Sequence, residues 1–517
     1  MSPAIDLIVI GSGVNGLTTA ARVARAGRSV LVLERRAVAG GLAAAEEFHP
    51  GYRSPGFFQD TGGLRPAVVS GLGLVGHGLE MRSEPAPILA LGGKGGAILL
   101  HADPDRAAPE IAAHSAADAS RYAGFRAFLA GIRPLLADFI DRPPLNLIEI
   151  DSESPWELMR RGLGIRRLGA KRMMELLRLP PMAVADWLGE WFECGLLKAA
   201  LALPSVAGAY MGPRSPQSAM NLLLHEGAAG PGVVGGSQAL AAALEKCAGA
   251  SGARIRTGAR VERLLVGSKG VEGVRLAGGE EIRAAGVAAA CDPKQLFLDL
   301  LPTGALPGRV IEKIRAFRTR GTTAQVLLAM SRPLRFAARQ EVPVELARIG
   351  RDLDHLEKAF DAVKYRRWSE DPVLEVQAAS AVSGRLAPAG HDAVSILVHH
   401  APYDLEGGWD AETAERLAEL VLSRLEEHAP GIRSAVVARA VRSPADLEAL
   451  YGLTGGHVHH GEYALDQLLV RPIPECVGYR SPLAGLHLCG SGSHPGGGLT
   501  CAPGWLAAAE ILRTGRP

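Results

Sequence analysis

A strand, a glycine-rich loop, a helix and a second strand at the start of the chain limit the folds open to it more than any other feature. In "AIDLIVIGSGVNGLTTAARVARAGRSVLVLERR", the apolar residues 5–10 predict a strand, and residues 17–26 predict a helix. The run "SVLVLE" predicts a second strand that ends at Glu34. A dinucleotide fingerprint needs glycines for a tight turn, for approach to a pyrophosphate and for helix packing. Those positions hold Gly11, Gly13 and Gly16.

Glu34 completes this pattern, because an acid about 20 residues after the glycines can bind a ribose hydroxyl. The alternative is a glycine-rich turn in some other α/β unit. Since strand, loop, helix, second strand and acid all agree, we predict a Rossmann-type unit that binds a dinucleotide. The contacts expected from this unit are Gly11, Gly13, Val14, Asn15, Gly16, Glu34 and Arg35.

A second glycine pair bears on which dinucleotide is bound. Gly40 and Gly41 follow the acid, and Leu42 then begins a long excursion in place of an immediate helix. Farther on, residues 255–276 alternate apolar and polar positions, which predicts a β-meander. An acid followed by a glycine pair, with a meander inserted later, is more typical of flavoproteins than of NAD dehydrogenases.

A dense glycine cluster lies close to the end of the chain, in "LHLCGSGSHPGGGLTCAPGWLAAAEIL" at residues 486–512. Ordering glycine costs backbone entropy, so such a cluster suggests a ligand that the backbone approaches closely. The segment after it predicts a helix that begins near residues 500–505.

Several motifs together resemble the phytoene desaturase family, most closely its branch of pyridine nucleotide-disulfide oxidoreductase domain-containing proteins. They are GSGVNG with Glu34 and the glycine pair, "GGSQALAAALEK", "CDPKQLFLDLLP", "HHAPYDLEGGWD", "GLTGGHVHHGEYALDQLLVRP" and "LCGSGSHPGGGLTCAPG". The resemblance covers nearly the whole chain in order. It implies the α/β architecture of amine oxidase-like flavoproteins, with FAD as cofactor and no metal.

The family architecture implies a Rossmann-type FAD-binding domain of discontinuous segments, with an inserted α+β substrate or cap domain. The FAD-binding domain is expected at residues 1–66, 226–302 and 476–517, and the substrate domain at 67–225 and 303–475. The last segment should return to the first Rossmann unit. The resemblance implies further FAD contacts at Gly40, Gly41, Leu42, Val261, Gly490, Gly497, Gly498, Leu499 and Thr500.

Two departures from the family pattern leave alternatives open. Cys501 stands where glycine is expected, and it could tether the flavin covalently or be a small buried residue. His457, His459 and His460 stand where the family tends to have Asn-x-Phe-His-Gly-Glu. They invite a metal interpretation, although no acidic or cysteine partner has matching spacing.

His460 is the candidate catalytic residue, a polar group beside the reacting atoms that titrates near neutrality. The alternative is a core histidine bonded to backbone. Residues 455–462 and 493–500 are both glycine-rich and both match the family, so we expect them to meet at the flavin ring, with His460 facing the substrate cavity. His494 precedes Pro495 in the glycine-rich loop and is expected to shape the flavin site.

Composition bears on the binding partners of the protein and on its cellular location. The net charge of +2 gives no reason to expect nucleic acid, and no run approaches the roughly 20 apolar residues that span a bilayer. Six cysteines without a CxxC pair, and no cationic apolar leader, favour a cytoplasmic protein. Residues 155–178 mix seven basic side chains with apolar ones. They could contact anionic lipid, or form a solvated face over the pocket.

We therefore expect an FAD-dependent oxidoreductase that desaturates or dehydrogenates an apolar, isoprenoid-like or otherwise lipophilic substrate by hydride transfer to flavin N5. Oxygen or a quinone would reoxidise the flavin. The alternatives are a flavin oxidase of an amine or alcohol, a flavin-dependent isomerase, and a catalytically quiet flavoprotein scaffold. The sequence leaves the substrate and the oligomeric state open.

Overall fold

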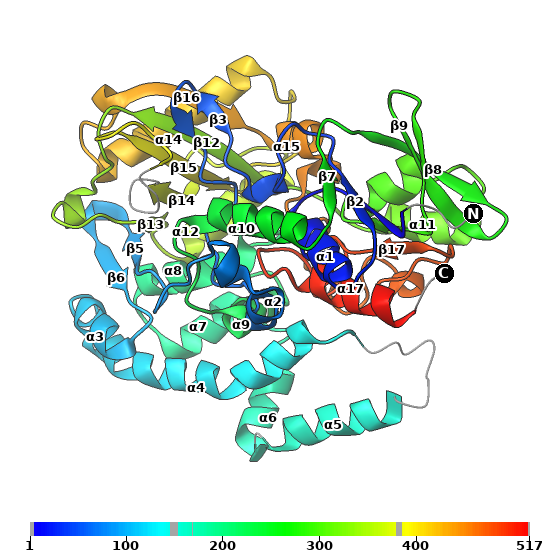
Figure 1. The fold of residues 1–517 in the computed structure, drawn as a ribbon. Helices are drawn as coiled ribbons and strands as arrows, with labels where there is room; N and C mark the ends of the chain where they lie inside the picture. Colours follow the sequence, from blue (N-terminus) through cyan, green and yellow to red (C-terminus); the bar gives the residue numbers. More distant parts are fainter. Residues whose placement is uncertain (1–4, 145–153, 168, 379–384, 515–517) are drawn as a thin grey trace.

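The protein has two large sheets, each covered by its own helices (Figure 1). The structure is a computed structural model that describes residues 5–144, 154–167, 169–378 and 385–514. Both ends of the chain lie beside the first sheet.

The first sheet is parallel and has five strands. They are β1 (Leu7–Ile10), β2 (Val30–Leu33), β7 (Arg254–Arg256), β11 (Gly286–Ala289) and β17 (Leu486–Leu488). Their order is β17-β11-β1-β2-β7, so three separate parts of the sequence build one sheet. Glu34 directly follows β2, as the sequence predicts.

Helices cover one face of this sheet, and a small meander covers the other. The helices are α1 (Val14–Arg25), α10 (Gly236–Ala250) and α17 (Ala502–Arg513); the meander is β8 (Val261–Gly267), β9 (Gly270–Leu276) and β10 (Glu281–Arg283). In β1, Leu7 and Val9 join the core beneath the helices, whereas Ile8 and Ile10 join the core beneath the meander. Alternating residues of an apolar strand are thus buried on both faces, as is typical of parallel sheets.

Two local predictions need correction. Helix α1 begins at Val14 and not at residue 17, because Gly13 is its N-cap and the fingerprint residues form its first turn. The strand around Ile255 does not belong to the meander; it pairs in parallel with β2 and forms the edge of the first sheet.

The second sheet has seven strands in the order β16-β12-β15-β14-β13-β5-β6. They are β5 (Ile88–Leu91), β6 (Ala97–Leu100), β12 (Thr323–Met330), β13 (Leu346–Ile349), β14 (Val373–Ala378), β15 (Asp392–His399) and β16 (Val436–Arg442). All neighbours are antiparallel except β13 and β5. The apolar face packs against α14 (Ala411–His428).

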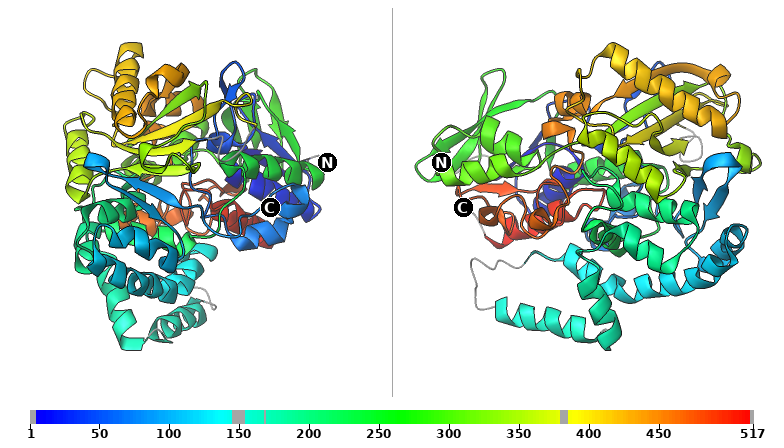
Figure 2. Two further views of the ribbon diagram at one scale, coloured as in Figure 1. Left: turned by 90° about the vertical axis from the view of Figure 1, so that its left-hand side faces the viewer. Right: turned by 180° about the vertical axis from the view of Figure 1, so that it is seen from behind.

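A helical layer lies beside the second sheet and has its own core. It consists of α3 (Pro104–Ala112), α4 (Ala116–Asp141), α7 (Val184–Trp191), α8 (Gly195–Val206), α9 (Ser218–Ala228) and α12 (Leu353–Lys364). Two further helices, α5 (Ser154–Arg167) and α6 (Gly169–Arg178), lie at one end of the molecule on the outer side of α4 (Figures 1 and 2). We call these two helices the arm.

The remaining elements are short connections. They are β3 (Glu47–His49), β4 (Tyr52–Arg53), α2 (Pro66–Leu72), a π-helical turn (Gln295–Leu300), α11 (Gly308–Ala316), α15 (Pro444–Tyr451) and α16 (Leu465–Leu468). In the described residues, no helix combines the length and apolar character needed to cross a membrane.

This architecture confirms the predicted α/β fold with a Rossmann-type parallel core. The boundaries of the five predicted domain segments stay predictions. The first sheet draws its strands from residues 7–33, 254–289 and 486–488, and the second from residues 88–100, 323–399 and 436–442.

Candidate active site

The fingerprint loop has the backbone geometry that its glycines predict. Gly11 has φ of +94°, a conformation that favours glycine. A Cβ at Gly16 would lie 2.1 Å from the carbonyl oxygen of Gly11, so only glycine lets the helix pack this closely. A Cβ at Gly13 would meet nothing within 4 Å. The backbone at Gly13 therefore borders open space, at the amino end of α1, where no side chain caps the helix.

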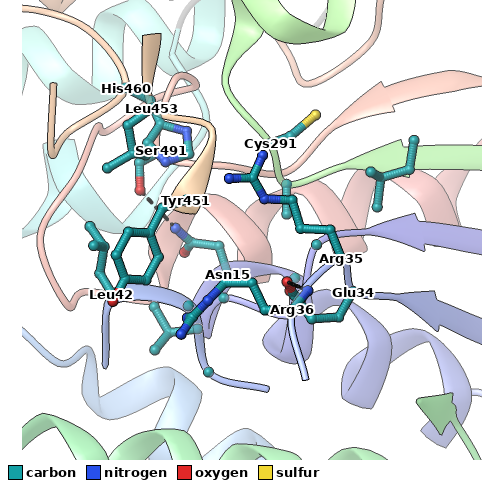
Figure 3. A pocket seen from close by; sticks show the side chains of 18 of the residues that line it. Asn15, Glu34, Arg35, Arg36, Leu42, Cys291, Tyr451, Leu453, His460 and Ser491 are labelled. Carbon is teal, nitrogen blue, oxygen red and sulfur yellow. Dashed lines mark hydrogen bonds between the residues drawn. The ribbon is translucent and has the colours of Figure 1, made fainter. Parts of the chain in front are cut away.

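A cavity extends from this loop, and we call it the fingerprint cavity. Its walls include fourteen of the predicted residues, namely Gly11, Gly13, Val14, Asn15, Gly16, Glu34, Arg35, Gly40, Gly41, Leu42, Val261, His460, Gly498 and Leu499. Figure 3 shows several of these side chains around the space, together with Tyr451, Leu453 and Ser491. Segments from both ends and the middle of the chain thus meet at one site.

The second glycine pair packs against the protein itself. Gly40 has φ of +110°, and its N–H donates to the carbonyl of Ser12 at 2.9 Å. A Cβ at Gly41 would lie 3.0 Å from the Cα of Gly13. The pair therefore allows its segment to lie directly on the fingerprint loop.

Glu34 lies on the cavity wall with only 6% of its surface exposed. The N–H and Oγ–H of Ser12 donate to its Oε2 at 2.9 and 2.7 Å, and the N–H of Arg36 donates to Oε1 at 2.9 Å. An ionised carboxylate accepts about four hydrogen bonds. Glu34 therefore braces the loop and keeps capacity on Oε1 for a ligand hydroxyl.

Two arginines after Glu34 attach this edge of the cavity to α15. Arg35 donates to the carbonyls of Ala449 and Leu450 at 2.7 and 3.2 Å. The guanidinium of Arg36 lies 4.4 Å from the ring centroid of Tyr451 and pairs with Glu46. These contacts hold the 449–453 segment over the fingerprint loop.

The last helix closes the site from the other side. The Nδ2 of Asn15 donates to Ser491 Oγ at 3.1 Å, and Thr19 donates to the carbonyl of Gly504 at 3.0 Å. A Cβ at Gly504 would lie 2.1 Å from the carbonyl oxygen of Asn15, so glycine allows α17 to cross α1 closely. The chain end therefore returns to the first Rossmann unit.

Gly490, a predicted FAD contact, does not line either cavity. A Cβ at Gly490 would lie 2.6 Å from the carbonyl oxygen of Ala290, so this glycine allows close backbone packing.

A second cavity, of about 210 Å³, lies between α9 and the second sheet, and we call it the sheet cavity. Gly497, Gly498, Leu499 and Thr500 line it. Four residues line both cavities, and we call them the neck: Phe58, Val458, Gly498 and Leu499. The two cavities are thus adjacent, with glycine and apolar side chains between them.

The histidine motif contacts the glycine-rich loop, as the sequence predicts. A Cβ at Gly497 would lie 2.5 Å from His459 Nδ1, and Tyr463 donates its hydroxyl to the carbonyl of Gly497 at 3.0 Å. Arg471 supports the motif by donating to the carbonyls of Gly461 and Glu462, both at 3.0 Å. That the two loops meet at the flavin ring stays a prediction.

The histidines do not face the same space. His460 lines the fingerprint cavity, whereas His459 lines the sheet cavity and stacks on Phe58 with ring centroids 5.7 Å apart. His460 was expected to face the substrate cavity. Its backbone has φ of +53°, which turns consecutive side chains toward different cavities.

Burial lowers the pKa of His460 to about 4; Arg471 lowers the pKa further, and a hydrogen bond to the backbone of Cys291 opposes the shift. Burial likewise lowers the pKa of His459 to about 4. The expectation that His460 titrates near neutrality is therefore wrong, because a buried imidazole without a carboxylate partner stays neutral.

The other open alternatives involve Cys501, His494 and a metal. Cys501 is fully buried in the core beneath α1 and outside both cavity walls; burial raises the pKa of its thiol to about 12. His494 bonds through Nε2 to the carbonyl of Phe139 at 2.8 Å. Across the residues that the structure describes, no group of three or more His, Cys, Asp or Glu side chains is placed to hold a metal ion.

Sequence reasoning missed several wall residues, among them Phe58, Tyr451, Cys291 and Val458. Phe58 is an ordinary apolar residue, which carries no signal of its own. Cys291 and Val458 lie within motifs already singled out and Tyr451 directly precedes one, so these motifs were the available signal.

The residues present fit FAD. Gly13 and Gly498 each leave space that a Cβ would fill, the uncapped start of α1 suits a pyrophosphate, and Glu34 retains an acceptor for a ribose hydroxyl. The fold and the residues around the fingerprint cavity together define a flavin-dependent oxidoreductase.

The comparisons agree with this class. The sequence matches "NAD(P)-binding Rossmann-like domain" over residues 9–61 and "Flavin containing amine oxidoreductase" over residues 120–512. The chain belongs to the flavin-containing amine oxidoreductase family and is an FAD-dependent enzyme.

Relatives and solved structures extend the match over the whole chain. The chain is 34% identical to "Pyridine nucleotide-disulfide oxidoreductase domain-containing protein 2" of Rattus norvegicus, over 99% of this chain and 94% of the rat protein. It is 28% identical to hydroxyneurosporene desaturase of Cereibacter sphaeroides, over 98% and 97%. A putrescine oxidase variant shares the fold, with a TM-score of 0.61 at 15% identity over 99% of each chain. The predicted family and cofactor are confirmed.

Proposed function

We propose that the enzyme removes two hydrogens from a lipophilic substrate held in the sheet cavity, by desaturation or dehydrogenation. The observation that carries this proposal is the neck. Phe58, Val458 and Leu499 place apolar side chains where the sheet cavity adjoins the fingerprint cavity. An apolar carbon chain fits there without leaving a polar group unpaired.

When bound, FAD supplies a two-electron centre that takes a hydride equivalent from carbon. The protein's own residues position the substrate and handle the second hydrogen, which leaves as a proton. His459 lies on the sheet-cavity wall beside the neck and is neutral at pH 7, because burial keeps its pKa near 4. A neutral imidazole is able to accept that proton.

The neck also argues against amine oxidation. None of its four residues carries a charge, so a substrate ammonium would have no counter-charge there. The likeness to putrescine oxidase is one of fold alone at 15% identity, whereas the 28% match to a desaturase spans both chains. We propose oxygen or a quinone as the acceptor that reoxidises the flavin.

Product mass tests the reaction. FAD-loaded protein mixed without air with candidate isoprenoids should lose its yellow colour and release a product lighter by two hydrogens. A product of unchanged mass would indicate isomerisation, and ammonia released from amines would indicate amine oxidation. Either result would contradict the proposal.

A matched pair of variants tests the neck itself. Val458→Phe should slow flavin reduction while FAD content stays normal, because the larger side chain fills the passage. Val437→Phe makes the same change at an exposed position of β16 and should leave the rate unchanged.

We also propose that the arm contacts an anionic membrane surface. Trp156, Met174 and Leu177 are 67%, 62% and 62% exposed, and Arg166 and Arg167 at the end of α5 are exposed as well. Apolar side chains with adjacent arginines suit a lipid surface. Leu168 and the side chains of Leu158, Arg161 and Lys171, which the sequence argument also used, lie outside the described residues.

A further inference from the structure

The wall that the second sheet presents to the sheet cavity is mostly polar, with Leu397 on β15 as an apolar member. Thr323 on β12, Arg348 on β13, Glu375 on β14 and His399 on β15 all line the cavity and are all buried. The intervening residues of these strands point the other way and pack beneath α14. A polar buried face contributes less to packing than an apolar one, which suggests a binding role.

Two charge pairs line the sheet cavity. Arg348 donates to Glu375 at 2.9 Å, and His225 on α9 pairs with Asp60 at 2.9 Å. Gln59 links the pairs, because its Nε2 donates to the carbonyl of Glu375 at 3.3 Å and Asp60 is its neighbour. Arg348 also interacts electrostatically with Asp60 and His225.

These pairs satisfy one another. With His225 protonated, two carboxylates face one guanidinium and one imidazolium, so the cluster has no net charge. A charged substrate group would be buried without a free counter-charge, which is costly. The cluster therefore favours a neutral polar group over a carboxylate or an ammonium.

Several buried polar atoms around the sheet cavity have no hydrogen-bond partner within the described part of the chain. They include Thr323 Oγ1 and both ring nitrogens of His399 on the sheet, and Gln59 Oε1 and Asn221 Oδ1 on the segments that face it. The amide orientations follow from their bonds, since Asn221 Nδ2 donates to the carbonyl of Ser205 at 3.1 Å and Gln59 Nε2 to that of Ser395 at 3.0 Å. Two acceptors are thus left, and they require a donor that a carbonyl group cannot supply.

We infer that the sheet cavity recognises a neutral hydroxyl group on an otherwise apolar substrate, through Gln59, Asn221, Thr323 and His399. The apolar body then extends from this polar wall to the neck. The inference rests on the proposed function only in taking the sheet cavity as the substrate site.

Binding of four matched ligands to the FAD-loaded protein tests the inference. Phenethyl alcohol, propylbenzene, phenethylamine and hydrocinnamate share one apolar body and carry a hydroxyl, a methyl, an ammonium and a carboxylate. Calorimetric titration without air should give an affinity for the alcohol about tenfold or more above the other three, because a site built for a hydroxyl leaves its groups unpaired with the analogues. Equal or tighter binding of any other member, or no binding of the alcohol, would overturn the inference.

Variants of Thr323 test whether its hydroxyl contributes to the preference for the alcohol. Thr323→Val removes a hydroxyl that no other described residue bonds, and it should lower the alcohol affinity about tenfold while propylbenzene binds as before. Thr323→Ser keeps the hydroxyl and should keep the preference. Thr322→Val is the control, because Thr322 lies outside the cavity walls and its hydroxyl donates to the carbonyl of Ala209. An unchanged preference in a folded Thr323→Val protein would overturn the inference.

These outcomes are independent of the redox proposal. A strong preference for the alcohol together with products of unchanged mass would refute dehydrogenation and leave hydroxyl recognition standing. Products lighter by two hydrogens without any preference for the alcohol would refute hydroxyl recognition and leave dehydrogenation standing.

Discussion

Replacing Glu34 by alanine tests whether this carboxylate braces the fingerprint loop as well as binding the cofactor. Glu34 is 6% exposed and accepts hydrogen bonds from the N–H and Oγ–H of Ser12 and from the N–H of Arg36. The Ser12 hydroxyl can rotate toward another acceptor, whereas the two amides cannot.

The magnitude follows from those two amides. Each buried donor left unpaired costs about 1–3 kcal/mol. Glu34→Ala should therefore lower the free energy of unfolding of the FAD-free protein by about 2–6 kcal/mol. Loss of the ribose contact should weaken FAD by a further ~1–3 kcal/mol, or roughly 5- to 150-fold.

Urea unfolding of the FAD-free protein and fluorescence titration with FAD separate the two effects. Glu280→Ala is the control, since Glu280 forms an exposed pair with Arg256 and should change neither quantity measurably. A Glu34→Ala protein with unchanged stability would refute the bracing role. Unchanged FAD affinity would show that another group holds the ribose.

Three further predictions concern His460, acid stability and the arm. His460→Ala should leave FAD bound; if the imidazole of His460, rather than that of His459, is the general base, flavin reduction should slow by ~10²-fold or more, and in the unmodified enzyme the rate should fall only as pH approaches the pKa of about 4. An unchanged reduction rate would leave His460 a structural residue. The folded protein holds His460 with a pKa below the unfolded value of about 6.5, so its contribution to stability is full above that pH and is lost as pH falls toward 4. Urea unfolding should show a loss of about 2 kcal/mol from this residue between pH 6.5 and 5, and His460→Phe should remove that part of the slope. Vesicles with anionic lipid should bind the protein less as salt rises, and neutralising Arg160, Arg166, Arg167 and Arg172 should have the same effect; salt-independent binding, or none, would refute lipid contact by the arm.

The nucleotide fold was predictable because its signals are local. Strand period, glycine positions and the acid at residue 34 lie within one short stretch, and the structure places them as β1, α1 and β2. The start of α1 was missed by three residues, because a helix with glycine as N-cap has no side-chain cap to mark it.

The histidine motif shows what sequence alone could not decide. Its contact with the glycine-rich loop was predicted, but the left-handed backbone at His460 sends His459 and His460 to different cavities. Their low pKa values arise from burial beside Arg471, and burial is a property of the assembled fold.

The second sheet makes the same point for substrate recognition. In the stretch "TTAQVLLAM", the sequence by itself determines that Thr323 and Gln325 share one face of a strand, because side-chain direction in a strand has a period of two. Only the tertiary structure decided that this polar face meets α9 and the 57–60 segment across a cavity, while the apolar face packs on α14. Local periodicity fixes which residues share a face, whereas contacts between segments hundreds of residues apart fix what that face encloses.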